Sequence, residues 1–396
     1  MNNVFVFVVC GSKEHIDTLH FSLRYLKHFS KNEIIVLTDS LRNEISIEHE
    51  NIIDVNTPEF FTHHQASIYL KTGIHKFLPK GNNYCYLDTD VVALNEDVDL
   101  IFNEFKAPIT FAPDHCKVNE FSPYAVFCGC IEKWEAKRDI FEKASLKYDK
   151  NRKIKDPIIL KEQRKLLAHF EELKKNLTKK ALTAIRYFTS PKKFLLNNDF
   201  YFDKKRRVWI STKILKPVLY EVPIKKIKKE TGFSYNKWTQ KWLDENGEDF
   251  LEYKCKHLLQ FINNKFSVKV NPNWQHWNGG VFLFNDLSID FLTEWHEKTL
   301  EVFKDENWRT RDQGSLIVTA NKFGLQDHPT LAKKWNFIAD YFKKGVDFNE
   351  EGYFTDDNWH TKQKVNFIHI YHEWGNKDWP IWNWVLKRKE IFYENK

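Results

Sequence analysis

The N-terminal part of the chain alternates between two hydrophobic patterns. Short apolar runs predict buried strands, and between them apolar residues recur every three or four positions, which predicts amphipathic helices. The predicted strands are Val4–Val9, Glu33–Thr38, Asn51–Val55 and Tyr84–Leu87, and the predicted helices are Ile16–Phe29 and Gln65–Leu78. Strands that alternate with helices favour an α/β fold with a mostly parallel sheet flanked by helices.

The pattern changes after Ile131. Seven apolar residues between Leu166 and Phe188 fall at steps of three and four, which predicts one apolar stripe on a basic helix. Strand-like patterning resumes near Phe266, and Gly279–Asn285 predicts another core strand. We therefore predict a basic, largely helical insertion over residues 132–265. It would separate an N-terminal half, residues 1–131, from a C-terminal half, residues 266–396.

Charge and composition narrow the class of protein. The chain has 396 residues, 42% of them hydrophobic and 29% charged, as in a globular protein. Its net charge of +7 comes from one segment, because residues 143–207 hold 20 Lys and Arg against 7 Asp and Glu. The first apolar run lacks the basic flank and the length of a signal peptide, and no run reaches the roughly 20 apolar residues of a membrane-spanning helix. We expect a cytoplasmic protein.

The six cysteines are spread along the chain, at positions 10, 85, 116, 128, 130 and 255. Two of them form the short motif Cys128-Gly129-Cys130, which could hold a metal or a redox pair. No matching second pair of cysteines accompanies it, so a structural role for reduced thiols is the preferred interpretation.

The clearest candidate for chemistry is a pair of aspartates, Asp88 and Asp90, directly after the predicted strand Tyr84–Leu87. Ligands of open α/β sheets bind outside the carboxyl ends of the strands. Two carboxylates in this place suit Mg²⁺ or Mn²⁺, which in turn suits a departing diphosphate. An Asp-x-Asp motif alone is common in surface turns, but the buried strand before it and the apolar run after it favour a functional site.

With this pair as its anchor, the sequence resembles glycosyltransferases of the GT-A fold, and glycosyltransferase family 8 in particular. Four further features occur in the family's order. These are Lys71, the segment Asn278-Gly279-Gly280, the segment Arg311-Asp312-Gln313-Gly314, and the C-terminal segment from His372 through Gly375 and Lys377 to Trp379. They cover both ends of the chain and leave out the basic insertion.

The resemblance implies a role for each matching residue. Asp88, Asp90 and His372 would hold the metal, and Lys71 and Lys377 would contact donor phosphate. Asn278, Asp312 and Gln313 would surround the transferred sugar, and Gly279 and Gly375 would allow the donor a close approach. A UDP-sugar donor and retention of the anomeric configuration are also implied. Residues 1–131 would form the nucleotide-sugar-binding half of the domain, and residues 266–396 the acceptor or catalytic half.

Three departures from the family pattern bear on these roles. Asp378 stands where the family has proline, the spacing from Gly375 to Lys377 is one residue shorter, and Gly279 replaces serine or alanine. His369 is a second choice for the metal ligand, on the opposite face of a regular strand from His372.

Other residues near these motifs have weaker claims. Asp114 and His115 could border an acceptor cleft, and Trp274, His276 and Trp277 could form an aromatic platform for a sugar or simply pack in the core. The adjacent pair His63 and His64 is interpreted as facing solvent, because neighbouring residues on a helix point apart.

The expected partners are a nucleotide-sugar donor and a glycan or lipid-linked acceptor. The basic insertion is either a solvated basic face or a surface for anionic lipid, and nucleic acid is not expected. Two other functions remain open. A sugar-1-phosphate nucleotidyltransferase would share the fold, although Cys10-Gly11-Ser12-Lys13 lacks its glycine-rich loop. A non-enzymatic protein that binds membranes or polymers is the second.

Overall fold

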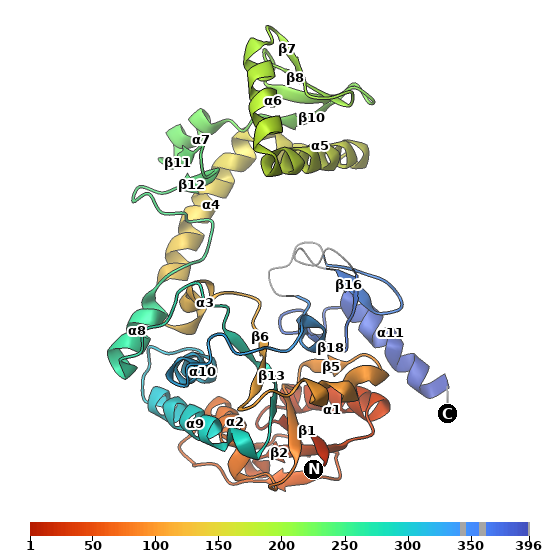
Figure 1. Ribbon diagram of the computed structural model, residues 1–396, viewed down its shortest axis with the longest axis vertical. Coiled ribbons are helices and arrows are strands. Elements are labelled where there is room, and N and C mark those ends of the chain that lie inside the picture. The colour runs from red at the N-terminus through yellow and green to blue at the C-terminus, as the bar shows by residue number, and fades with distance from the viewer. Residues whose placement is uncertain (341–345, 356–361, 395–396) are drawn as a thin grey trace. The chain divides into compact units, whose positions relative to one another are not determined.

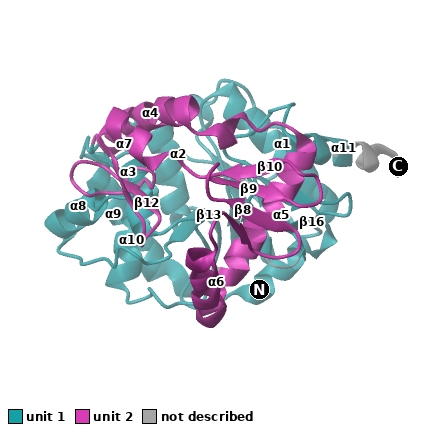
Figure 2. Cartoon of the chain, turned by 90° about the horizontal axis from the view of Figure 1, so that it is seen from above, with its two compact units in different colours: residues 1–128, 254–396 teal, residues 129–253 magenta. Residues whose placement is uncertain are grey.

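The computed structural model describes residues 1–340, 346–355 and 362–394 of the chain (Figure 1). The chain divides into two compact units, which Figure 2 colours separately: unit 1 comprises residues 1–128 and 254–396, and unit 2 comprises residues 129–253. The sequence pattern had placed the insertion at residues 132–265. Its C-terminal boundary differs because helix α8 (His257–Phe266) buries Leu258 and Ile262 in the core of unit 1.

Unit 1 is built on a six-stranded sheet with the order β3-β2-β1-β4-β13-β6. The first four strands in this order run parallel, and β13 is antiparallel to both of its neighbours. The predicted α/β fold with a mostly parallel sheet is therefore confirmed. The strands are β1 (Asn3–Val8), β2 (Glu33–Thr38), β3 (Ile52–Asp54), β4 (Asn83–Leu87), β6 (Thr110–Pro113) and β13 (Trp277–Phe284).

Both faces of this sheet are covered. Phe5 and Phe7 of β1 belong to one apolar core, whereas the alternate residues Val4 and Val6 belong to the other. This arrangement explains why the strands are apolar throughout rather than alternating. The helices of unit 1 are α1 (Lys13–Phe29), α2 (His63–Thr72), α3 (Val118–Ala125), α8, α9 (Ile289–Phe303), α10 (Arg311–Lys322) and α11 (Pro380–Glu394).

The predicted helix Gln65–Leu78 begins and ends earlier in the structure. Thr62 and Gln65 form a capping box at the start of α2, which sets its first residue at His63. The α-helix ends at Gly73, and a 3₁₀ turn over Ile74–Lys76 follows.

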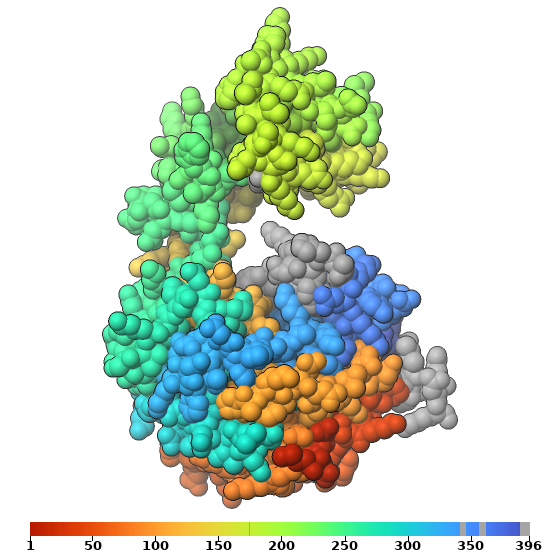
Figure 3. Space-filling model, viewed as in Figure 1, coloured from red at the N-terminus to blue at the C-terminus, as the bar shows by residue number. Residues whose placement is uncertain are grey.

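A second, three-stranded sheet of unit 1 joins segments from distant parts of the chain. Its order is β14-β18-β5, with β18 antiparallel to β5 and His369 opposite Val91. Figure 3 shows the orange and blue segments of the chain packed against one another in this unit. The strands are β5 (Val91–Ala93), β14 (Phe337–Ile338) and β18 (Phe367–His369), and a further small sheet comprises β15 (Asp347–Phe348), β16 (Tyr353–Thr355) and β17 (Gln363–Lys364).

Unit 2 is mixed rather than largely helical. Its helices are α4 (Cys130–Tyr148), α5 (Pro157–Lys175), α6 (Leu177–Thr189) and α7 (Ile224–Thr231). An antiparallel sheet of β7 (Lys193–Leu195), β8 (Phe200–Asp203), β9 (Val208–Ser211) and β10 (Pro217–Tyr220) accompanies them, as does the hairpin of β11 (Ser234–Asn236) and β12 (Lys241–Leu243). These strands are only three or four residues long, which gave little periodic signal in the sequence.

The single basic helix expected around Leu166–Phe188 is two helices. Asn176 separates them, and its side chain accepts a hydrogen bond from the backbone N–H of Lys179 at 2.9 Å, which caps the start of α6. An asparagine in the middle of an apolar stripe therefore ended one helix and began the next.

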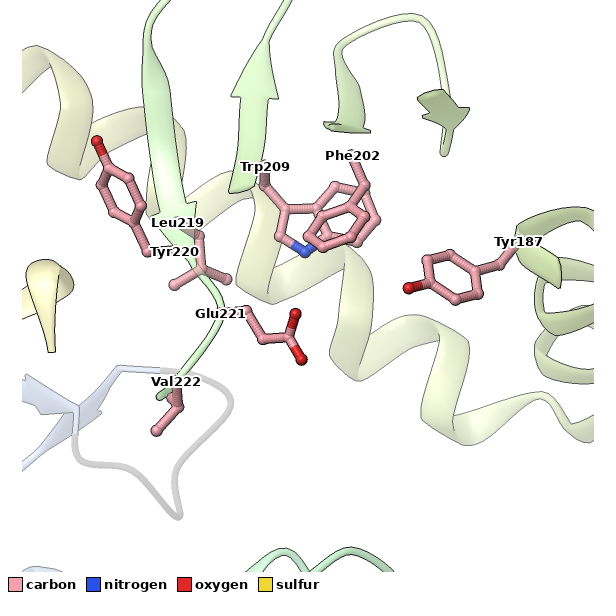
Figure 4. A pocket seen from close by; sticks show the side chains of 7 residues that line it. All are labelled: Tyr187, Phe202, Trp209, Leu219, Tyr220, Glu221 and Val222. Atoms are coloured by element: carbon pink, nitrogen blue, oxygen red, sulfur yellow. The ribbon is translucent and has the colours of Figure 1, made fainter. Parts of the chain in front are cut away.

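Unit 2 has its own small apolar core, formed by residues that include Leu166, Phe200 and Val218. Beside it lies a pocket of about 310 Å³. Figure 4 shows the Tyr187 hydroxyl and the Glu221 carboxylate directed into the same space. Among the described residues of either unit, no helix has both the length and the apolar character needed to cross a bilayer.

Candidate metal and donor site

The carboxylates of Asp88 and Asp90 are held where β4 ends. The backbone N–H of Asp88 donates to the carbonyl of Gly280 on β13 at 2.8 Å, and the N–H of Val91 donates back to the Asp88 carbonyl at 3.1 Å. The Asp90 carbonyl accepts from the N–H of Ile370, just after β18, at 3.1 Å. The turn that carries both aspartates is thus fixed from the central sheet and from the second sheet.

His369 is the third member of this group. Its Nε2 atom lies 3.2 Å from Oδ1 of Asp90. One ligand atom from each of Asp88, Asp90 and His369 lies within 4.8 Å of the other two. Two carboxylate oxygens and one imidazole nitrogen form a donor set that suits Mn²⁺ and also accepts Mg²⁺. The residues present therefore fit the divalent cation that the motif implies.

His369 is buried, and its ionisation reflects two opposing influences. Burial acts to lower the pKa of the imidazole, because it disfavours the charged form. The carboxylates of Asp90 and Asp88 outweigh burial and raise the pKa above its ordinary value. Without a cation, the two aspartates therefore favour the protonated form of this ring.

His372, the first choice for the metal ligand from the sequence, lies outside this group. Its side chain is exposed, and its backbone N–H donates to Oδ2 of Asp340 at 2.6 Å. His369 is the last residue of β18 and pairs with Val91, one residue after Asp90, so the strand register brings its ring to the aspartates. His372 follows after the strand has ended. The geometry therefore favours the second choice, His369.

Gly375 and Lys377 lie in the same exposed segment after β18. Gly375 has a φ of +76°, in the left-handed region that favours glycine, and the Lys377 carbonyl accepts from Nδ2 of Asn383 at 2.6 Å. Within the described part of the chain, no hydrogen bond or ion pair joins either residue to the acidic pair. Their expected contact with the donor stays a prediction.

Lys71, on α2, lies between two carboxylates. Its Nζ atom is 3.1 Å from Oδ1 of Asp88 and 3.3 Å from Oδ2 of Asp312, and it lies 5.2 Å from the centre of the Tyr86 ring. The side chain is only 10% exposed. Burial acts to lower the pKa of Lys71, but the two carboxylates raise it above its ordinary value. The ammonium group is therefore charged and engaged with aspartates, which favours a positioning role over an open phosphate contact.

Asp312 completes this ion triad. Burial acts to raise the pKa of its carboxyl, but the charge of Lys71 and, to a smaller extent, of His64 holds the pKa below its ordinary value. Asp312 therefore stays ionised, and it couples the start of α10 to the acidic pair through one lysine.

The segment Asn278-Gly279-Gly280 lies at a register shift between β13 and β6. Oδ1 of Asn278 accepts from the backbone N–H of Gly280 at 2.9 Å, and Oε1 of Gln313 accepts from the N–H of Gly279 at 3.1 Å. Nε2 of Gln313 donates to the carbonyl of Trp277. The two amide side chains predicted to surround a sugar are therefore oriented by the same stretch of backbone.

Gly280 allows three side chains to meet. A Cβ atom built at this position would lie 2.7 Å from Cε1 of His369, 2.8 Å from Oδ1 of Asn278 and 3.0 Å from Oδ2 of Asp88. At Gly279 the nearest atom would be Oε1 of Gln313, at 3.2 Å. Glycine at position 280 is thus required for the close packing of the metal group, whereas position 279 is less restricted.

Asp114, which follows β6, joins this network more firmly than the sequence suggested. Its Oδ2 accepts from Nδ2 of Asn278 at 3.0 Å, and its Oδ1 lies 2.8 Å from Nδ1 of His115. Burial acts to raise the pKa of Asp114, but the imidazoles of His276 and His115 and the bond from Asn278 hold it well below its usual range. The carboxylate is a buried anion beside the predicted sugar-binding residues.

Two residues of the site were missed from the sequence. Asn336, just before β14, donates from Nδ2 to Oδ1 of Asn278 at 3.0 Å, and it also contacts His369. No motif marks it, because its partners are far away in the chain. The hydroxyl of Tyr86 donates to Oδ1 of Asp88 at 2.5 Å. Strand alternation could have indicated Tyr86, since it stands two residues before Asp88 and shares its side of β4.

The aromatic candidates near the segment are mostly part of the core. Trp274 and Trp277 are 9% and 1% exposed, and both belong to the apolar core beside β13. This burial favours the packing interpretation over an acceptor platform.

Comparison with known proteins gives structural likeness only. No family model matches the chain, and no curated protein matches its sequence. The chain is similar to mouse xyloside xylosyltransferase 1 in its apo form, with 11% identity, a TM-score of 0.38 and coverage of 96% of this chain and 99% of that one. It is also similar to the bifunctional glycosyltransferase WbbM in its apo form, with 12% identity and a TM-score of 0.41 over all of this chain and 52% of that one.

A third similar structure is the galactosyltransferase LgtC in complex with donor and acceptor sugar analogues. The identity is 15% and the TM-score 0.22, and the match covers 28% of this chain and 46% of LgtC. The chain thus matches about half the length of LgtC and of WbbM. All three similar structures are glycosyltransferases. Their TM-scores are all below 0.5, so the function of this chain rests on the residues of the site.

Proposed function

We propose that this chain is a metal-dependent glycosyltransferase that moves a sugar from a nucleotide sugar to a glycan or lipid-linked acceptor. The observation that carries the proposal is the convergence of Asp88, Asp90 and His369 at the carboxyl end of β4. In open α/β sheets this edge is where nucleotides bind.

The chemistry follows from the donor set. A bound Mn²⁺ or Mg²⁺ would supply positive charge for a diphosphate leaving group. The protein's own part is to keep the ligands in place: Gly280 and Ile370 fix the backbone on either side of the turn, and Lys71 fixes the Asp88 carboxylate. A site whose ligands are fixed in advance has less reorganisation to undergo during the reaction.

The sugar would lie beside the amide groups of Asn278 and Gln313. Both amides are aligned by the backbone of β13, and Asp114 adds a buried carboxylate that can accept from a sugar hydroxyl. Amide and carboxylate groups next to a metal group support a polyhydroxylated ligand rather than an apolar one.

Two finer parts of the proposal rest on the resemblance to glycosyltransferase family 8. The donor would be a UDP-sugar, and the sugar would keep its anomeric configuration. NMR analysis of the product tests the second part, because an inverted linkage would contradict it.

A screen of nucleotide sugars tests the function as a whole. We expect a UDP-sugar to raise the melting temperature in the presence of Mn²⁺, and the protein to release UDP slowly from it. The double variant Asp88→Asn, Asp90→Asn should lose both effects, whereas Asp290→Asn, an exposed carboxylate of α9, should keep them. Release of pyrophosphate from a nucleoside triphosphate and a sugar phosphate would instead identify a nucleotidyltransferase.

The proposed contact with a lipid-linked acceptor involves unit 2. Helix α6 exposes a row of large apolar side chains, of which Leu177 and Phe188 are 78% and 79% exposed. Lys179, Lys180 and Arg186 lie on the same helix. A basic helix with an exposed apolar row suits the interface of an anionic bilayer. We therefore place a peripheral membrane contact, near a lipid-linked acceptor, among the proposals.

A further inference from the structure

The cysteine motif that had no matching pair in the sequence acquires one in the structure. Cys255-Lys256-His257 returns to the same place as Cys128-Gly129-Cys130, so that a Cys-x-Cys pair meets a Cys-x-His pair. Each of these four residues offers one ligand atom, and these atoms lie within 4.8 Å of one another. We propose that they bind a structural zinc ion, which is independent of the metal of the proposed transferase site.

The distances agree with a tetrahedral thiolate site. Sγ of Cys128 lies 4.0 Å from Sγ of Cys255. Two sulfurs bound to zinc at about 2.3 Å and at the tetrahedral angle are separated by roughly 3.8 Å, so only a small contraction is needed. A disulfide, with sulfurs about 2 Å apart, would require a larger movement.

Hydrogen bonds hold the segments that carry Cys128, Cys255 and His257. The N–H of Cys255 donates to the Asn119 carbonyl at 3.0 Å, and its Sγ lies 3.1 Å from Oγ of Ser122. The same hydroxyl accepts from the N–H of Leu258, next to His257, at 3.0 Å. The backbone around Cys128 is held by the bond from the Phe127 N–H to the Asn307 carbonyl at 2.8 Å. The ligands are therefore positioned by the protein before any ion binds.

The fourth ligand, Cys130, is separated from Cys128 by one residue. Compact zinc sites usually have two to four residues between paired ligands, so a spacing of one requires a sharp turn. Gly129 provides it with a φ of +67°, in the region that favours glycine. The local backbone thus explains how so short a motif can offer two thiols.

Three thiolates and one neutral imidazole saturate a tetrahedral zinc ion and leave no position for substrate or water. The role is therefore structural. The ion would join residues 128–130 to residues 255–257. Cys128 and Cys255 are 127 positions apart, and a clip that closes so long a loop removes much conformational freedom from the unfolded chain.

Metal analysis of the full-length protein tests this proposal without any activity assay. Protein incubated with zinc under reducing conditions and then desalted should retain about one zinc per chain. The Cys128→Ser, Cys255→Ser variant should lose it. Asp88→Asn, Asp90→Asn should keep it, as should Cys85→Ala, which removes a buried thiol of β4.

Cobalt gives a second readout on the wild-type protein, in case the double variant does not fold. Cobalt should produce thiolate-to-metal charge-transfer absorption and the intense visible bands of tetrahedral coordination, and zinc should bleach both. The single variant His257→Gln should shift the visible bands. A wild-type protein that retains no zinc and shows no thiolate bands would overturn the proposal. So would bands that persist in the cysteine variant, or a Cys128–Cys255 disulfide in peptide maps of the purified protein.

Discussion

The side-chain amide of Asn336 orients the ring of His369, with Oδ1 of the asparagine 3.0 Å from Nδ1 of the histidine. Since Nδ2 of Asn336 donates to Asn278, its oxygen faces the ring and accepts a hydrogen bond from the N–H at Nδ1. In the neutral ring that a metal requires, the lone pair of Nε2 then faces the aspartates and can bind the cation. One asparagine therefore fixes the tautomer of the proposed metal ligand and links it to the proposed sugar-binding residue.

Replacing Asn336 should weaken metal binding without touching a ligand. We expect Asn336→Ala to lower the affinity for Mn²⁺ by about 10- to 100-fold, as is typical when the outer partner of a metal-bound histidine is lost. Calorimetric titration of Mn²⁺ measures this. His372→Ala is the matched control and should bind as the wild type does. Loss of binding in His372→Ala would restore that residue as the ligand.

Gly279 and Gly280 should differ sharply in how well they tolerate replacement by alanine. Gly280→Ala would place a Cβ atom 2.7 Å from His369 and 3.0 Å from Asp88, so the metal group would have to open. Gly279→Ala would place a Cβ atom 3.2 Å from the flexible end of Gln313 and 3.4 Å from Nζ of Lys71. We expect Gly280→Ala to lose Mn²⁺ binding and Gly279→Ala to retain it. Equal binding by the two variants would contradict the close packing described here.

Removing the charge of Lys71 should destabilise the protein. Lys71→Met leaves the carboxylates of Asp88 and Asp312 close together without their cation, and breaking such a buried pair typically costs about 3–5 kcal/mol. Urea unfolding should show a loss of this order. Lys13→Met removes an ion pair with Asp17 at the surface and should leave the unfolding curve unchanged. If both variants had the same free energy of unfolding, the ion triad would contribute little to the stability of the protein.

Acid should destabilise unit 1 through a buried histidine. Burial lowers the pKa of His296 to about 3, and the ring is 1% exposed. In the unfolded chain, His296 binds a proton near pH 6.5. In the folded chain, it does not bind this proton until about pH 3. The free energy of unfolding should therefore fall by about 1.4 kcal/mol per pH unit as the pH decreases through this window.

The variant His296→Gln removes this proton uptake. Its stability should depend less on pH between 6.5 and 4 than that of the wild type, as urea unfolding at a series of pH values would show. Identical slopes for the two proteins would assign the acid sensitivity to other groups, of which His75, with a pKa lowered to about 4 by burial, is the first to examine.

The exposed row on α6 should decide whether the protein binds anionic vesicles. We expect Ile185→Ser, Phe188→Ser to reduce flotation with phosphatidylserine vesicles at least several-fold, because both side chains are more than half exposed on this basic helix. Leu146→Ser, an exposed leucine of α4, is the control and should float as the wild type does. Unchanged flotation of the α6 variant would remove the lipid contact from the proposal.

Local sequence was sufficient wherever the signal lies within one element. The run Val4–Val9 is apolar because both faces of its strand are covered, and Asp88 and Asp90 stand out because a buried strand ends directly before them. These features predicted the mostly parallel sheet and the place of the acidic pair. The exact ends of α2 and the break at Asn176 depend on caps, which periodicity does not reveal.

Only the tertiary structure decided which distant side chains meet. The sequence favoured His372 over His369, and the pairing of β18 with β5 brings His369 to the aspartates instead. Asn336 has no motif, and Cys255 lies 127 positions from the thiol it approaches. Such contacts arise from strand register and chain crossings that no local period encodes. The sequence therefore determined the elements and their chemistry, and the packing of those elements determined the sites.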